Sequence, residues 1–245
     1  MAEYDTIRSV GVGARAQIDE GLRAHMNKVY GLMSVAMVVT AGVAWAVGSS
    51  DQLFSILRNP ATGQMTILGW IAMFLPLGMV FAFGALITRM SAAAAQLFFY
   101  AFAAAMGLSL AWIFQVFTLP SIATTFVATA AGFAGLSLYG YTTNRDLSGL
   151  GRFLMMGLIG LIVAMVVNYF LASEGLAWAI SVIGVLIFAG LTAYDTQNIK
   201  NTYIAHAQAM DQEWLGKAAI MGALNLYLDF INLFMFLLQF MGNRE

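Results

Sequence analysis

Residues 153–172 read FLMMGLIGLIVAMVVNYFLA, a run of twenty residues without Asp, Glu, Lys or Arg. An α-helix needs about 20 apolar residues to cross the hydrocarbon core of a bilayer. The strands of a membrane β-barrel are shorter and alternate between apolar and polar residues, which this segment does not. The segment therefore predicts a transmembrane helix.

Six further segments repeat this pattern along the chain. They are Val29–Val47, Thr66–Thr88, Ala92–Phe114, Ser121–Tyr141, Leu176–Tyr194 and Ala218–Gly242, of which only the last contains a charged residue. Short links between several of them force antiparallel neighbours in a compact bundle. We therefore expect an all-α polytopic membrane protein, with an N-terminal tail over 1–28, seven transmembrane helices over 29–242 and a short C-terminal tail over 243–245.

The composition excludes several classes of function. Hydrophobic residues make up 61% of the chain and charged residues 9%, against about 25% charged residues in ordinary globular domains. So few charges do not suit a soluble enzyme or a nucleic-acid binder. The chain has no cysteine, no HExxH, GxxxxGK[ST] or GxSxG motif, and no nucleophile–base pair within the apolar segments. We therefore expect a protein that is not an enzyme and has no resident cofactor.

Basic residues predict the orientation in the membrane, because they concentrate in cytoplasmic loops. With the N-terminus inside, most of them fall on the inner side, and only two lie outside, Arg58 and Arg244. The N-terminal residues also lack the apolar core of a removable signal peptide. This pattern predicts a multi-pass protein of a bacterial inner membrane, with the N-terminus in the cytoplasm and the C-terminus outside.

Asp229 is the one acid inside an apolar segment, near the middle of 218–242. A charged side chain at the bilayer centre costs at least about 2.5–3.5 kcal/mol on insertion scales, so it must be paired, neutralised or in contact with water. One interpretation is a protonated aspartate that holds helices together through hydrogen bonds. The other is a site for an ion or a proton.

Asp229 belongs to a stripe on its helix. Helical spacing places Asn225, Asp229, Asn232, Phe236 and Gln239 on one face. Since polar groups avoid lipid, this face should contact protein or a cavity. Asn225, Asn232 and Gln239 are therefore candidate pore-lining residues, and a hydrogen-bonded helix interface is the alternative.

Asp195 directly follows the sixth apolar segment, and Arg89 ends the second segment on the same side of the membrane. Asp195 is either a helix-end residue in water or a partner of Asp229. Arg89 is either a basic residue that extends to the membrane surface or a counter-ion for Asp195. Counted along the helices from Lys200 and Lys217, Asp195 and Asp229 differ in depth by about 10 Å, so they meet only if the last helix starts outside the membrane or tilts.

Several segments resemble the Bax inhibitor-1 family, also called the transmembrane Bax inhibitor motif proteins. The chain is similar to a bacterial member of this family. The segments are Ala193-Tyr194-Asp195-Thr196-Gln197-Asn198-Ile199, the segment Ala223-Leu224-Asn225-Leu226-Tyr227-Leu228-Asp229-Phe230-Ile231-Asn232-Leu233-Phe234, the loop Asn144-Arg145-Asp146-Leu147-Ser148, and Arg89 followed by Tyr100.

The resemblance implies six helices around a central seventh and a pH-sensitive leak of cations, with Ca²⁺ as the ion. It also implies that Asp195 and Asp229 form a paired-aspartate sensor and are the candidate Ca²⁺ ligands, with Arg89 as the latch for Asp195. The second segment, 66–88, contains no acid, in contrast to some members of the family.

Two other functions stay open at this point. Bacterial relatives are associated with a membrane-bound AAA protease, so the chain is alternatively a regulatory membrane protein that acts through such a partner. A proton-coupled transporter with Asp229 as the carrier is the third hypothesis.

Overall fold

The computed structural model describes the backbone of residues 2–207, 209 and 211–243, with side chains from residue 18 onward. Residues 244–245 of the expected C-terminal tail lie outside this set. The described residues form nine helices: α1 (Ala2–Gly48), α2 (Asp51–Leu57), α3 (Ile67–Leu86), α4 (Ala92–Leu110), α5 (Ile113–Val116), α6 (Leu119–Thr142), α7 (Ser148–Leu171), α8 (Glu174–His206) and α9 (Gln212–Met241).

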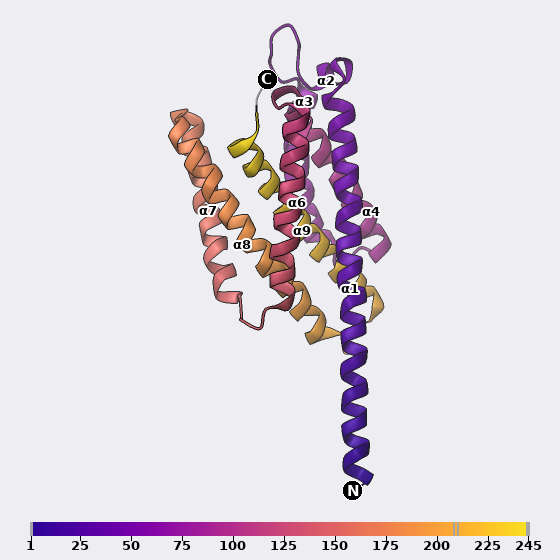
Figure 1. Ribbon diagram of the computed structural model, residues 1–245. Helices are drawn as coiled ribbons and strands as arrows, with labels where there is room; N and C mark the ends of the chain where they lie inside the picture. Colours follow the sequence, from indigo (N-terminus) through magenta and orange to yellow (C-terminus); the bar gives the residue numbers. More distant parts are fainter. Residues whose placement is uncertain (1, 208, 210, 244–245) are drawn as a thin grey trace.

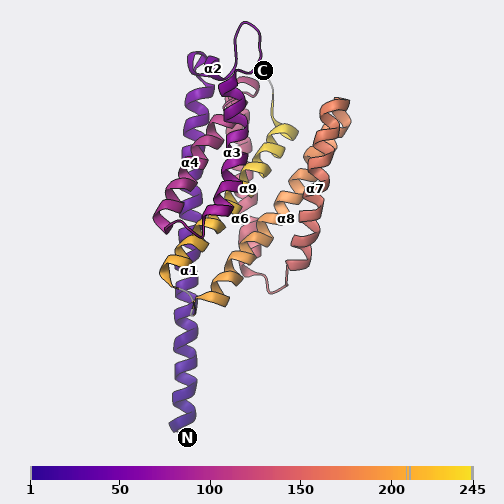
Figure 2. The ribbon, with the colours of Figure 1, turned by 180° about the vertical axis from the view of Figure 1, so that it is seen from behind.

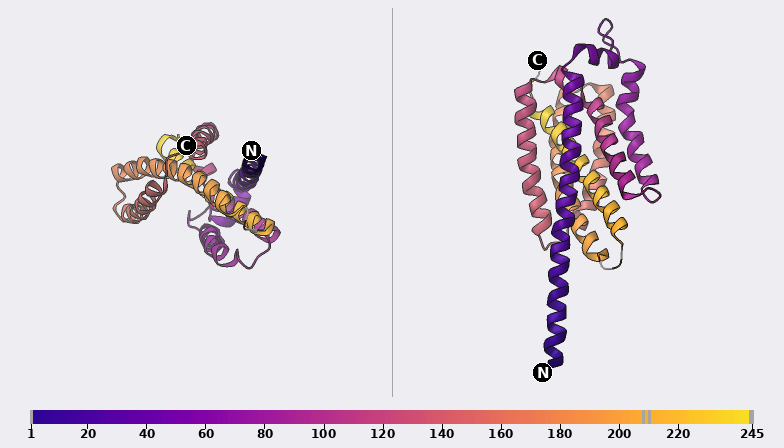
Figure 3. Two further views of the ribbon diagram at one scale, coloured as in Figure 1. Left: turned by 90° about the horizontal axis from the view of Figure 1, so that it is seen from below. Right: turned by 90° about the vertical axis from the view of Figure 1, so that its right-hand side faces the viewer.

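Seven helical segments are long and apolar enough to cross a membrane, as the sequence predicts. They correspond to α1 from residue 18, α3, α4 with α5, α6, α7, α8 and α9. The expected boundary at residue 28 falls inside a helix, because α1 continues without a break from residue 2 to residue 48. Figure 3 shows this helix projecting beyond the bundle at its N-terminal end.

Several helices begin where the sequence supplies a side chain that accepts a hydrogen bond from a free backbone N–H group. Thr66 accepts from Gly69 N, Ser91 accepts from Ala94 N, and Asp211 accepts from Trp214 N. These caps fix the start of α3, α4 and α9. The tight connections that they create place consecutive helices side by side (Figure 1).

The C-terminal helix α9 is the centre of the bundle, as expected. The most apolar stretch of α9 is 67% buried inside the protein, whereas that of α7 is 11% buried. Helix α9 packs against α1, α4, α6 and α8, while α3 packs on α4 and α7 packs on α8. Four helices thus surround α9 directly, and α3 and α7 form the flanks.

Close contacts fix α8 beside its neighbours just before Asp195. The Cα of Gly140 in α6 lies so close to the Ala193 carbonyl oxygen of α8 that a Cβ at residue 140 would overlap that oxygen. A Cβ at Gly151 in α7 would overlap the Tyr194 ring. Because only glycine fits both places, α6 and α7 hold α8 at a defined position next to the acid.

A buried hydrogen-bond chain joins α9 to two of its neighbours. The hydroxyl groups of Tyr227 in α9 and Thr40 in α1 lie 2.6 Å apart. Thr40 also donates to the Ala103 carbonyl oxygen of α4 at 2.8 Å. This chain ties α1, α4 and α9 together on the side of α9 away from α7.

Candidate ion site

The structure brings Asp195 of α8 and Asp229 of α9 together on the wall of one cavity, close enough for their carboxyl groups to interact. Both helices extend further than the apolar segments indicate, to His206 and from Gln212. Asp195 lies about 16 Å from the end of α8, and Asp229 lies about 25 Å from the start of α9. Both helices are inclined relative to α1 (Figures 1 and 2), and the two acids meet where α8 and α9 pack against each other.

Asp229 is almost completely enclosed, with 4% of its surface exposed. Its Oδ2 atom has no hydrogen-bond partner among the described residues. Ionised carboxylates only accept hydrogen bonds, so a bond between two carboxyl groups requires a proton on one of them. The pair therefore holds at least one proton whenever the two carboxyl groups are bonded to each other.

A cavity of about 400 Å³ opens beside the two acids, between α7, α8 and α9. We call this space the acid cavity. Four members of the expected stripe line it, Asn225, Asp229, Asn232 and Phe236, together with Asp195 and apolar side chains of α7. Gln239 is exposed near the end of α9 and is not among the lining residues. The stripe thus faces a cavity over most of its length, and Gln239 lies beyond it.

Asn232 keeps its side-chain carbonyl oxygen free for other partners. Its Nδ2 donates to the Leu228 carbonyl oxygen at 2.8 Å, one turn earlier in α9. The Oδ1 atom and the second N–H of Nδ2 then remain available. With Asp195 and Asp229, the acid cavity has a lining of oxygen atoms suited to a hard cation.

A second cavity, of about 470 Å³, lies at the end of the bundle from which α1 projects. We call it the mouth cavity. It is lined by residues of α1, α8, α9 and the turn after α3, among them His25, Thr88, Asn198 and Lys217. Asn225 lines both cavities. The Asn225 side chain therefore lies between the mouth cavity and the two acids. The sequence pattern alone does not predict this position.

Arg89 is not part of the acid cavity. It lies in the turn between α3 and α4, its side chain is exposed, and it forms no salt bridge with any residue that the structure describes. The turn is fixed to α9, because Lys217 donates to the Met90 carbonyl oxygen at 3.1 Å and Ala92 N donates to Glu213 Oε1 at 2.5 Å. The expected contact of Arg89 with Asp195 is absent in this state, since a guanidinium at a helix end extends toward the polar surface.

Comparisons with known proteins agree with this architecture. Residues 22–245 match the family described as "Inhibitor of apoptosis-promoting Bax1". The inner membrane protein YbhL of Escherichia coli is 46% identical over 225 residues, which cover 92% of this chain and 94% of YbhL. The protein RP147 of Rickettsia prowazekii is 43% identical over 93% of this chain and 92% of its own length. The protein YrjE of Lactococcus lactis is 39% identical over 92% and 93%, respectively.

Proposed function

The chain belongs to the Bax inhibitor-1 family, and from that premise we propose that it is a pH-sensitive cation leak channel gated by Asp195 and Asp229. The observation that carries the proposal is the pair of carboxyl groups inside the acid cavity, separated by Asn225 from a second cavity at the mouth of the bundle. A passive ion path needs polar groups at the membrane interior that bind an ion briefly and release it.

The paired acids supply the response to pH. Two carboxyl groups in contact titrate as a unit, so loss of a proton adds a negative charge to the cavity. Among the residues that the structure describes, they are the only acidic or basic ones that line this cavity, which has walls from α7, α8 and α9. The exposed Asp146 of the α6–α7 loop is no alternative sensor, because hydrogen bonds from Ser148 lower its pKa and keep it ionised near neutral pH.

Calcium suits the lining as a permeant ion rather than as a resident one. Ca²⁺ takes about 6–8 oxygen ligands from carboxylates, amide carbonyls and water. With one oxygen from each carboxyl group, these groups and the amides of Asn225 and Asn232 provide four ligands, so water must complete the shell. Incomplete coordination by the protein favours rapid release, which is what conduction requires.

Arg89 takes a secondary part in this proposal. Its neighbours Ile87 and Thr88 line the mouth cavity, so the turn that carries Arg89 forms part of the mouth. A reorientation of the exposed Arg89 side chain toward Asp195 would bring a positive charge to the ionised acid and favour that form. Arg89 would then shift the pH of the transition without being the group that titrates.

A flux measurement tests the proposal. The purified protein in liposomes, with a fluorescent Ca²⁺ indicator inside, should admit Ca²⁺ without any partner, at a rate that changes with pH. Uptake that appears only with an imposed proton gradient would indicate a proton-coupled transporter. Absence of uptake at every pH would reject the channel and leave a role through a protein partner, such as a membrane AAA protease.

The orientation gives a separate prediction. We propose that the N-terminus lies in the cytoplasm of a bacterium and the C-terminus outside, because Arg145, Arg152, Lys200 and Lys217 all lie at the N-terminal end of the bundle. Alkaline phosphatase, which is active only outside the cytoplasm, should be active when fused after residue 245 and inactive when fused within 201–212. Equal activity at both fusion sites would contradict the seven-span topology.

A further inference from the structure

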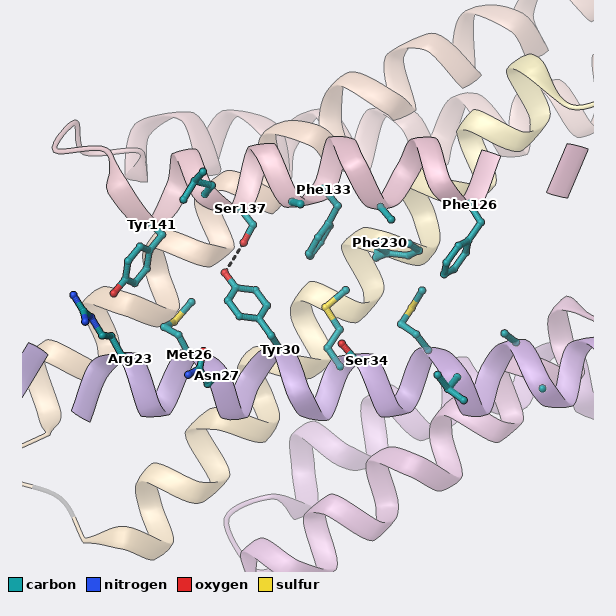
Figure 4. A pocket seen from close by; sticks show the side chains of 18 residues that line it. Arg23, Met26, Asn27, Tyr30, Ser34, Phe126, Phe133, Ser137, Tyr141 and Phe230 are labelled. Carbon is teal, nitrogen blue, oxygen red and sulfur yellow. Dashed lines mark hydrogen bonds between the residues drawn. The ribbon is translucent and has the colours of Figure 1, made fainter. Parts of the chain in front are cut away.

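A large groove runs between α1 and α6, on the side of α9 away from the acid cavity. Its volume is about 1120 Å³, slightly above the range of about 300–1,000 Å³ that is usual for ligand pockets. Helix α1 packs mainly on α4 and α9, and α6 packs on α8 and α9, so α9 closes the groove at its base with Phe230. Figure 4 shows side chains of α1 and α6 facing each other across it.

The lining changes from polar to apolar along the groove. Arg23, Asn27 and Tyr141 lie at the end toward the N-terminal side of the bundle, and Arg23 and Tyr141 point toward one another (Figure 4). A hydrogen bond of 2.5 Å between the Tyr30 and Ser137 hydroxyl groups crosses the groove next. Beyond it, apart from Ser34, the lining is apolar: Met33, Met37, Val38, Ala41, Gly42, Phe126, Ala130, Phe133, Ala134 and Phe230.

This order of polarity matches a phospholipid. Both walls are membrane-spanning helices, so the groove opens toward lipid and its apolar part must be covered by hydrocarbon. The lining residues of α6, from Phe126 to Tyr141, span about 22 Å, and those of α1, from Arg23 to Gly42, span about 28 Å. One leaflet, with its headgroup region, is about 20–22 Å thick. The groove therefore covers at least the full depth of one leaflet, with its polar end at the level of the headgroups.

The charge at the polar end selects the type of headgroup. Arg23 is exposed and forms no salt bridge with the described residues, although Asp19 and Glu20 precede it on the same helix. An unpaired guanidinium that lies beside a tyrosine hydroxyl is a typical donor set for phosphate. We propose that the α1/α6 groove binds an anionic glycerophospholipid, with the phosphate at Arg23 and Tyr141 and one acyl chain along Met33, Met37 and Phe133.

Native mass spectrometry tests this site on the full chain in detergent, with phosphatidylglycerol and phosphatidylcholine that carry identical acyl chains. The wild type should retain about five times as much phosphatidylglycerol as phosphatidylcholine, because one basic residue near a membrane surface contributes about 1 kcal/mol to the binding of anionic lipid. Arg23→Gln should remove the preference, while Arg152→Gln, an exposed basic residue on α7 at the same end, should keep it. Equal preference in the wild type and Arg23→Gln would overturn the headgroup assignment.

A bulky side chain in the groove should displace the lipid. Ala134→Trp should reduce the retained lipid about tenfold, whereas Ala131→Trp, an exposed position of α6 outside the groove, should not. If Ala134→Trp does not fold, Gly42→Phe serves instead, because a Cβ there meets no atom within 4 Å. Equal loss in the groove variant and in Ala131→Trp would contradict a specific site.

Photocrosslinking of the unmodified chain gives an independent result in a bilayer. Phosphatidylglycerol with a diazirine in its acyl chain should label peptides of α1 and α6 that include Met33, Met37 or Phe133. Labelling spread evenly over the exposed faces of α3 and α7 would show ordinary boundary lipid and reject the site.

Discussion

Replacing Asp229 by Asn is expected to make the Ca²⁺ leak of the reconstituted protein nearly independent of pH. Asparagine has the shape of a protonated aspartic acid, so the packing around the 4% exposed side chain should survive. The substitution removes one of the two titrating groups, and the shared titration disappears with it. The leak rate of the wild type should change about tenfold between acidic and alkaline buffer, because one pH unit changes the ratio of protonated to ionised acid tenfold. In Asp229→Asn the same change of buffer should alter the rate less than about twofold.

The partner acid provides the internal check on this result. Asp195→Asn should flatten the pH dependence to a similar extent, and the double variant should add little, because groups that act as one unit are not additive. Glu174→Gln, an exposed acid at the start of α8, should retain the dependence of the wild type. Unchanged pH dependence in Asp229→Asn would reject the paired-aspartate gate, and the leak itself would then need another sensor.

The transmembrane architecture is the part of the structure that the sequence predicts most completely. Long charge-free segments such as 153–172 admit few other structures, and all seven expected spans have a helix. Helix ends are harder to predict, since hydropathy marks the hydrocarbon and not the end of the hydrogen-bonded helix. Helix α8 continues to His206 through the polar residues after Asp195, and α1 begins well before the apolar segment.

The candidate site is likewise predictable from the sequence only in part. Periodicity on one helix places Asn225, Asp229 and Asn232 on a common face, and a cavity does lie there. The proximity of Asp195 to Asp229 depends on how α8 and α9 pack against each other, which a linear pattern does not contain. The exposed position of Arg89 depends on the contacts of its turn with Lys217 and Glu213, residues that are distant in sequence.

Asn225→Leu is expected to lower the leak at every pH by about tenfold. Asn225 lines both the mouth cavity and the acid cavity, so an ion that passes between them must pass its side chain. In the proposed path an ion would shed water there, and the amide oxygen would replace part of the lost hydration. Loss of a hydrogen bond to a charged group costs about 1.5–3 kcal/mol. Because about 1.4 kcal/mol corresponds to a factor of ten, this loss is sufficient for a tenfold lower rate. The measurement is the initial rate of Ca²⁺ uptake into proteoliposomes.

The same substitution at Asn201 separates this effect from a general loss of polarity. Asn201 is an exposed residue of α8 that lines neither cavity, so Asn201→Leu should conduct like the wild type. Because Asn225 does not titrate, Asn225→Leu should keep the relative pH dependence that Asp229→Asn removes. A low rate with an intact pH profile would assign Asn225 to the path and the two aspartates to the gate. A wild-type rate in Asn225→Leu would show that ions do not pass between these two cavities.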